Sequence, residues 1–164
     1  MTRPSWDEYF MEIARIVATR ATCPRAAVGS VIVSNKKIIS TGYNGSPSNT
    51  KHCYEIGCFM FENHCIRTIH SEANALLYAK QDLSNATIYT TYQPCINCSK
   101  LIMGAGITKI IYKHQYWDKT GEQLFLECNY ILFDNLIYAS FNNNQYFNSY
   151  LNPSLISNSY FRMK

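Results

Sequence analysis

Three metal-binding side chains and one carboxylate stand out in this 164-residue chain, at His70, Glu72, Cys95 and Cys98. Catalytic zinc sites take three ligands from the protein and leave the fourth position to water, whose pKa falls to about 7. His70, Cys95 and Cys98 can supply those ligands. Glu72, two residues after His70, is close enough to move protons without binding the metal. The four residues therefore predict hydrolytic chemistry at a zinc ion.

The same residues could instead form a structural zinc site beside an unrelated glutamate, because a Cys-x-x-Cys pair alone is typical of zinc knuckles and redox pairs. Pro94, directly before Cys95, has no role in a redox pair. His-x-Glu followed by Pro-Cys-x-x-Cys is the known signature of zinc nucleobase deaminases. The complete pattern favours the catalytic zinc.

The elements around the pattern support this interpretation. A β-branched and aromatic run predicts a strand over 86–92, and a helix over 95–103 follows it and stops at residues 104–106. A second helix is predicted over 71–80, directly after His70. Thiolates are favoured at a helix N-terminus, where backbone N–H groups are free.

The remaining segments predict an α/β sandwich. A capping box of Ser5 and Glu8 opens the first helix, and Asn35 with Lys36 forms a turn between two strands. We expect strands over 28–34, 37–43, 109–113 and 130–133, and a short helix over 122–127.

Length and composition set the frame. A chain of this length predicts one domain, and it lacks both a long apolar span and a secretory signal, so we expect a cytoplasmic protein without a membrane partner. The net charge of +4 does not distinguish an anionic small substrate from nucleic acid.

The connection over 44–68 has no evident structure of its own and needs an anchor. We predict a structural zinc bound by Cys23, Cys53 and two of three further residues. The candidates are Cys58, His64 and Cys65, with His52 in addition. Reduced thiols without metal are the alternative. Cys128, the remaining cysteine, looks like a buried helix residue.

Several separated stretches resemble the deoxycytidylate (dCMP) deaminases. They are residues 23–25, 28–33, 39–47, 64–75 and 92–98, which follow one another in the family's order. The resemblance implies a three-layer α/β/α cytidine-deaminase-like fold with a five-stranded mixed sheet, here over 1–136. It also implies hydrolysis of dCMP to dUMP and ammonia, which supplies dUMP for thymidylate synthesis.

The resemblance further implies a homohexamer that dCTP with Mg²⁺ activates and dTTP inhibits. Asn44 would bind the deoxyribose 3′-hydroxyl, and Tyr116 would stack on the base or its sugar. The turn of Gly42, Tyr43, Asn44 and Gly45 would border the effector site, although an ordinary loop has the same composition.

The substrate phosphate needs a cation, for which Arg25 and Arg67 are candidates, with solvated surface positions as the alternative. The chain departs from the family at Ser71, where alanine is more usual and where we expect the side chain to face away from the metal. The tail over 137–164 is rich in Asn, Tyr, Phe and Ser and matches nothing in the family.

Rival readings remain within and outside this chemistry. A tRNA adenosine deaminase shares both motifs but needs a basic surface, and the mild charge argues against it. A cytidine, free cytosine-nucleotide or guanine deaminase shares the chemistry with a different substrate. A non-catalytic zinc module on the same fold would have no use for Glu72.

Overall fold

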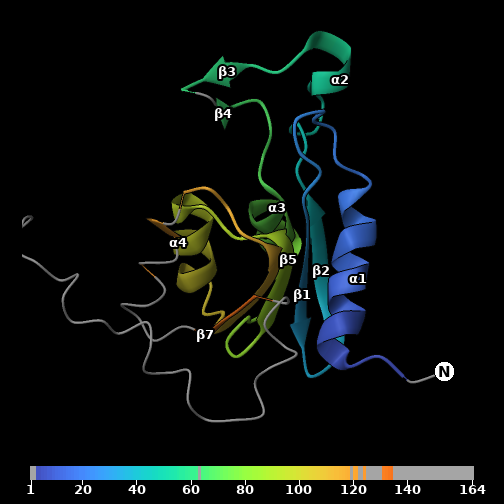
Figure 1. Ribbon diagram of the computed structural model, residues 1–164, viewed down its shortest axis with the longest axis vertical. Helices are drawn as coiled ribbons and strands as arrows, with labels where there is room; N and C mark the ends of the chain where they lie inside the picture. Colours follow the sequence, from blue (N-terminus) through green and yellow to red (C-terminus); the bar gives the residue numbers. More distant parts are fainter. Residues whose placement is uncertain (1–2, 63, 119, 122–123, 125–130, 135–164) are drawn as a thin grey trace, which may run out of the picture.

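The computed structural model describes residues 3–62, 64–118, 120–121, 124 and 131–134. A mixed five-stranded sheet lies between α1 on one face and α3 and α4 on the other, which confirms the predicted three-layer fold (Figure 1). The elements are α1 (Trp6–Ala18), β1 (Gly29–Ser34), β2 (Lys37–Tyr43), α2 (Cys53–Ile56), β3 (Met60–Phe61), β4 (His64–Cys65), α3 (Ser71–Tyr78), β5 (Thr87–Tyr92), α4 (Ile96–Gly104), β6 (Lys109–His114) and β7 (Ile131–Asp134).

The strands lie in the order β2-β1-β5-β6-β7. β1 is antiparallel to both β2 and β5, whereas β5, β6 and β7 are parallel to one another. Asn35 and Lys36 connect β1 to β2 with φ of 51° and 61°. Two positive φ angles in a two-residue loop match the twist of a tight hairpin, as the sequence predicts.

Side chains of the central strands alternate between the two faces of the sheet. Ile32 and Ile88 belong to the core beneath α3 and α4. Val31 and Tyr89 face α1 and pack with Phe10. All five side chains are at most 4% exposed, so the sheet is a rigid floor between two apolar layers.

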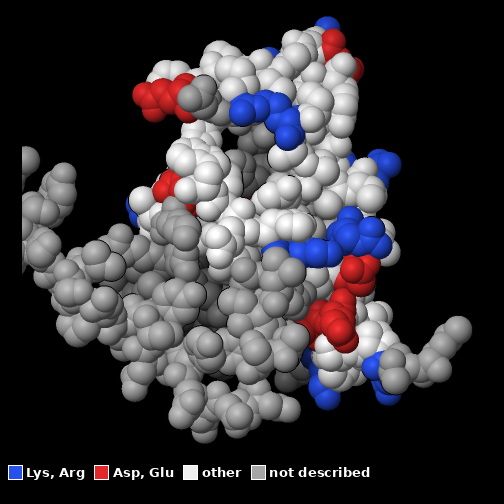
Figure 2. All heavy atoms as spheres, viewed as in Figure 1, with Lys and Arg blue, Asp and Glu red and all other residues white. Residues whose placement is uncertain are grey.

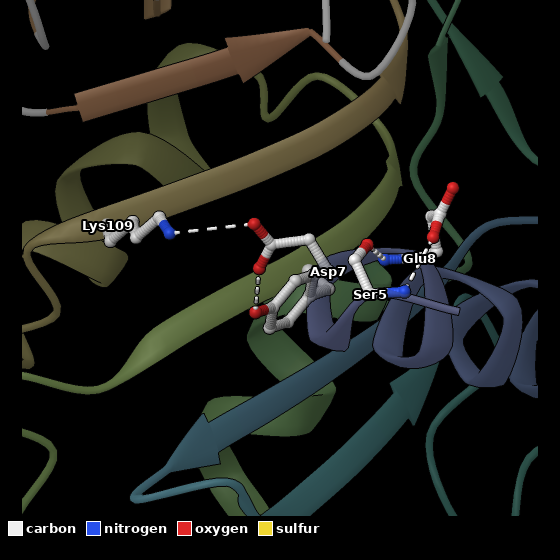
Figure 3. Close-up of polar contacts among 5 residues, drawn as sticks. Ser5, Asp7, Glu8 and Lys109 are labelled. Carbon is white, nitrogen blue, oxygen red and sulfur yellow. Dashed lines mark hydrogen bonds and ion pairs between the residues drawn. The ribbon is translucent and has the colours of Figure 1, made fainter. Parts of the chain in front are cut away.

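The start of α1 is attached to the sheet by polar contacts (Figure 3). Ser5 and Glu8 form the predicted capping box. Asp7 accepts a hydrogen bond of 2.6 Å from the Tyr89 hydroxyl and lies 3.8 Å from Lys109 Nζ. Through these contacts Asp7 joins the helix to both β5 and β6.

Gly42 of β2 sets how closely α3 approaches the sheet. A Cβ atom there would collide with the backbone of Ser71 and Ala75. Ser40, two residues earlier, donates a 2.7 Å hydrogen bond to the Ala75 carbonyl. The missing side chain therefore lets the first turn of α3, which follows His70, lie directly on the strand.

The connection over 44–68 is more ordered than the sequence suggests. It forms α2 and the β3–β4 hairpin, a lobe that extends beyond the sheet in Figure 1. The helix predicted over 71–80 ends at Tyr78. Cys128, most of 122–127 and the tail over 137–164 lie outside the described residues, within which no helix has the length and apolar character to span a membrane.

We predict that Gly42→Ala lowers the free energy of unfolding by about 1–3 kcal/mol, because the added methyl group forces α3 away from β2. Gly104→Ala is the matched control, since no atom lies within 4 Å of a Cβ placed there in α4. The control gains about 0.5–1 kcal/mol from helix propensity. Chemical denaturation measures both, and equal stabilities for the two variants would contradict the close-packing argument.

Candidate functional site

The four motif residues meet where α3 and α4 begin. His70 is the N-cap residue of α3 and Cys95 is the N-cap residue of α4. Strand β5 leads through Gln93 and Pro94 straight into Cys95, and Cys98 follows within the first turn. Both caps have extended backbone, which turns their side chains off the helix axes toward a common point.

The distances suit one tetrahedral metal ion. His70 Nδ1 lies 3.5 Å from the Sγ atoms of both Cys95 and Cys98. Zinc bonds of about 2.1 Å to nitrogen and about 2.3 Å to sulfur place such atoms about 3.6 Å apart at a tetrahedral angle. The residues therefore fit zinc, with three ligands and a fourth position toward the cavity.

The electrostatics of the three ligands favour a thiolate at Cys95, whereas the pKa of Cys98 is raised by the hydrogen bond with Cys95 and by burial. The hydrogen bond from the Cys98 thiol lowers the pKa of Cys95 to about 4, and His70 contributes further. The hydrogen bond between His70 and Cys95 raises the pKa of His70. A thiolate at a helix N-terminus is also stabilised by free N–H groups. The site thus prepares one anionic sulfur before any metal arrives.

Glu72 lies in the first turn of α3 and is 4% exposed. Burial raises the pKa of its carboxyl group, while the nearby charge of His70 opposes that shift. Ser71 Oγ donates a 2.9 Å hydrogen bond to Glu72 Oε2. The Ser71 hydroxyl also lies 2.8 Å from Ser30 Oγ of β1, and the contact of Ser71 with Glu72 is one that we did not predict.

A cavity of about 460 Å³ opens above these residues. Its lining includes three of the four motif residues, His70, Glu72 and Cys95, and two other groups, an aromatic wall and the base of the lobe formed by α2, β3 and β4. The lining residues are Cys23, Arg25, Ala26, Val28, Asn44, His64, Cys65, Thr68, His70, Ser71, Glu72, Tyr92, Gln93, Cys95, Gln115, Tyr116 and Trp117. Figure 2 shows a hollow below the lobe, with basic side chains at its rim.

Tyr116 lines the cavity, as the sequence suggested, but it does so beside Trp117, which we did not predict. The Trp117 ring stacks on His64, with centroids 5.8 Å apart. Gln93, also not predicted, accepts a 3.2 Å hydrogen bond from the Tyr116 backbone. The sequence offered one clue to both residues, since each is next to a residue that we had predicted or used in the motif. Gln93 precedes Pro94, and Trp117 follows Tyr116.

Asn44 is buried in the cavity wall. Its side-chain amide donates to the Ala26 carbonyl and accepts from Val28 N–H, both at 2.8 Å. An amide has two N–H donors and two acceptor sites, so one of each remains for a ligand. The other turn residues predicted for an effector, Gly42, Tyr43 and Gly45, are not among the residues that line this cavity.

The two candidate arginines differ. Arg25 lines the cavity, and its Nη1 lies 2.9 Å from Met60 Sδ in β3. Arg67 Nε donates to the Gly57 carbonyl at 3.2 Å, and Arg67 is not a lining residue. Among the described residues, Arg25 is therefore the better placed cation for an anionic ligand in the cavity.

A second cluster of side chains that could hold a metal ion lies at the base of the lobe. The Sγ atoms of Cys23, Cys53, Cys58 and Cys65 all lie within 4.8 Å of one another, with pairs at 3.7 Å and 3.6 Å. Four sulfurs around zinc are about 3.8 Å apart. The candidates His64 and His52 are not in the cluster: the His64 ring stacks on Trp117, and His52 occupies the N-cap position of α2.

Burial raises the pKa of Cys53 to about 12. Burial acts in the same direction on Cys65, but backbone N–H groups and the neighbouring thiols lower its pKa to about 7. Cys65 therefore loses its proton more easily than Cys53 does. A bound cation would offset the cost of the later charges.

The fold and the paired helix starts define a zinc-binding hydrolase site of the deaminase class. Residues 4–114 match the family model for the cytidine and deoxycytidylate deaminase zinc-binding region. This chain therefore belongs to the cytidine and deoxycytidylate deaminase family, within which it is similar to several deoxycytidylate deaminases.

Three relatives illustrate the similarity. ComE operon protein 2 of Bacillus subtilis is 45% identical over 119 residues, 71% of this chain but only 63% of that protein. Deoxycytidylate deaminase of Mycobacterium phage D29 is 40% identical, covering 68% of this chain and 97% of the relative. The crystal structure of cyanophage S-TIM5 dCMP deaminase with dCMP and dUMP superposes with a TM-score of 0.72 at 25% identity, over 82% and 99% of the two chains.

We predict that Cys95→Ser removes one zinc ion per chain, because a hydroxyl group is a far weaker ligand for zinc than a thiolate. Asn97→Ser is the matched control, since Asn97 is exposed between the two cysteines and outside the metal-binding cluster. Elemental analysis of the purified proteins measures the difference. Equal zinc contents in both variants would show that Cys95 is not a ligand.

Proposed function

We propose that this chain hydrolyses dCMP to dUMP and ammonia. The observation that carries the proposal is the buried Glu72 carboxyl beside a tetrahedral set of His70, Cys95 and Cys98 at the floor of an open cavity. The phage D29 relative is named deoxycytidylate deaminase, and the cyanophage neighbour was crystallised with dCMP and dUMP. dUMP formed in this way supplies thymidylate synthesis.

Zinc held by His70, Cys95 and Cys98 would supply a water molecule acidic enough to react at neutral pH. Glu72 takes one proton from that water and gives it to N3 of the cytosine ring as the oxygen adds to C4. It then moves the second proton from the new C4 hydroxyl to the amino group. The C4–N bond breaks, and uracil and ammonia leave.

Burial makes the Glu72 carboxylate a stronger base. The pKa of its carboxyl is raised by desolvation, so the group accepts a proton more readily than a carboxylate in water. Hydrogen bonds from the Glu72 backbone and from Ser71 oppose the shift, which keeps the group able to release the proton again. Both directions of transfer occur in each turnover.

The cavity wall suits a nucleoside monophosphate. Tyr116 and Trp117 offer flat apolar rings for the base or sugar, and Asn44 keeps one donor and one acceptor for the sugar hydroxyl. Arg25 is the charged group for the phosphate. Arg67 supports the lobe through Gly57 rather than the substrate.

Conversion of dCMP, followed by loss of the cytosine absorbance, tests the proposal. We expect turnover of dCMP and a higher kcat/KM for dCMP than for deoxycytidine, because Arg25 binds the phosphate. In Arg25→Gln that preference falls by about tenfold or more, mainly through KM. A preference that survives in Arg25→Gln would remove Arg25 from the phosphate site.

Glu72→Gln is the control for chemistry. It should lose about 10²–10⁴-fold in kcat while keeping its zinc. It should unfold at no lower a temperature than the wild type, since an uncharged amide replaces a buried ionisable group. Deamination of a tRNA anticodon stem-loop but not of dCMP would instead identify a nucleic-acid enzyme, and zinc without any turnover would identify a binding module.

We also propose a structural zinc at Cys23, Cys53, Cys58 and Cys65. Support comes from the sulfur–sulfur distances of 3.6 Å and 3.7 Å and from the burial of Cys23 and Cys53. Such a closed site contributes directly to folding. It would fix the lobe whose base forms one side of the cavity.

Cys58→Ser should therefore lose the second zinc ion and keep the first, and it should be less stable than the wild type. Zinc content and thermal unfolding, measured on the same samples, check both effects. Asn97→Ser serves again as the matched surface control. A wild-type protein that is folded with one zinc ion per chain would exclude the structural site.

Regulation and assembly follow from the resemblance alone. We propose activation by dCTP with Mg²⁺ and inhibition by dTTP, with the Gly42–Gly45 turn at the effector site, and a cytoplasmic homohexamer. The dCMP assay with each nucleotide added, and the mass of the protein in solution, decide these points. An activity that is the same with and without both nucleotides would remove the effector site.

A further inference from the structure

We propose that Ser71 positions the carboxyl group of Glu72, and that a buried row of hydroxyl groups holds Ser71 in place. This inference rests on the proposed role of Glu72 in moving protons. Ser71 Oγ donates to Glu72 Oε2 at 2.9 Å. Ser71 Oγ also lies 2.8 Å from Ser30 Oγ, and Ser30 donates to Thr90 Oγ1 at 3.1 Å.

The row crosses three elements and is closed to solvent. Ser71 belongs to α3, Ser30 to β1 and Thr90 to β5, and each of the three side chains has 0% exposure. A hydroxyl in such a place costs free energy unless it is hydrogen-bonded. Each hydroxyl has one proton, so while Ser71 donates to Glu72 the proton of Ser30 serves either Ser71 or Thr90. The positions of the oxygen atoms are nevertheless held by burial, and Ser71 Oγ stays within hydrogen-bond distance of Glu72.

A hydroxyl group suits a carboxyl group that gains and loses a proton. It carries one proton and two acceptor sites, so it donates to a carboxylate and accepts from a carboxylic acid. The hydroxyls of Ser30 and Thr90 can rotate to follow that change. Alanine at position 71 would leave Oε2 of Glu72 without this partner in either state, so that the carboxyl group would be held less firmly in its orientation.

Close packing makes the arrangement specific. The backbone of Ser71 lies against Gly42, so the start of α3 cannot shift outward or inward without a collision or a void. Ser71 is therefore a positioning residue: it acts through Glu72 rather than on the substrate. Its removal should change kcat and leave substrate binding intact.

The test compares three variants in the dCMP assay. Ser71→Ala should lose about tenfold in kcat, the effect of one hydrogen bond to a charged group, with KM within about twofold of the wild type and zinc unchanged. Ser71→Thr restores the hydroxyl and should regain most of the loss. Ser40→Ala removes a buried serine bond to the same helix, to the Ala75 carbonyl, and should lower stability without lowering kcat.

A kcat for Ser71→Ala within about twofold of the wild type would overturn the inference, and so would an equal loss in Ser40→Ala. If Ser71→Ala does not fold, Ser71→Cys gives the same comparison, because a thiol fills the space but is a weak donor. There we expect at least a threefold loss in kcat, and no loss would overturn the inference equally.

Crystal structures of the wild type and Ser71→Ala separate this inference from the proposed function. We expect the Glu72 carboxyl to leave its wild-type orientation, or to take several, in Ser71→Ala alone. An unchanged carboxyl group overturns the positioning role whatever the substrate is. A wild-type protein that fails to convert dCMP refutes the proposed function, while the orientation of Glu72 still decides the role of Ser71.

Discussion

The meeting of two helix N-termini at one point is the constraint on which the rest of the structure depends. His70 and Cys95 occupy cap positions, so their side chains converge only if α3 and α4 start at the correct height above the sheet. Gly42 sets that height for α3, and the short passage from β5 through Pro94 sets it for α4. Zinc at this point would tolerate little error in these positions, and the buried core beneath α3 and α4 holds them in place.

Most of the fold and the floor of the site followed from local signals. Apolar runs, the capping box at Ser5 and the turn at Asn35 placed the elements within a few residues. Contacts between distant segments could not be predicted in this way. The sequence does not reveal that His64 stacks on Trp117 and lies outside the cysteine cluster. The orientation of Ser71 likewise depends on Ser30, 41 positions away.

The cysteine cluster and the cavity share a wall. Cys23 and Cys65 line the cavity and also belong to the cluster, and each is near a residue with its own place in the wall, Arg25 and His64. Zinc bound by the cluster would therefore also fix two segments of the cavity wall, including Arg25, the group proposed for the phosphate.

The order of the ligands along the chain has a consequence for biosynthesis. All four thiols of the lobe precede residue 66, whereas the site at the helix starts needs Cys95 and Cys98, and the paired strand β5 that carries them. A ribosome synthesises the chain from its N-terminus at about 5–20 residues per second. The four thiols of the cluster thus emerge seconds before Cys95 and Cys98, so the zinc proposed there would have its complete ligand set before the site at the helix starts exists.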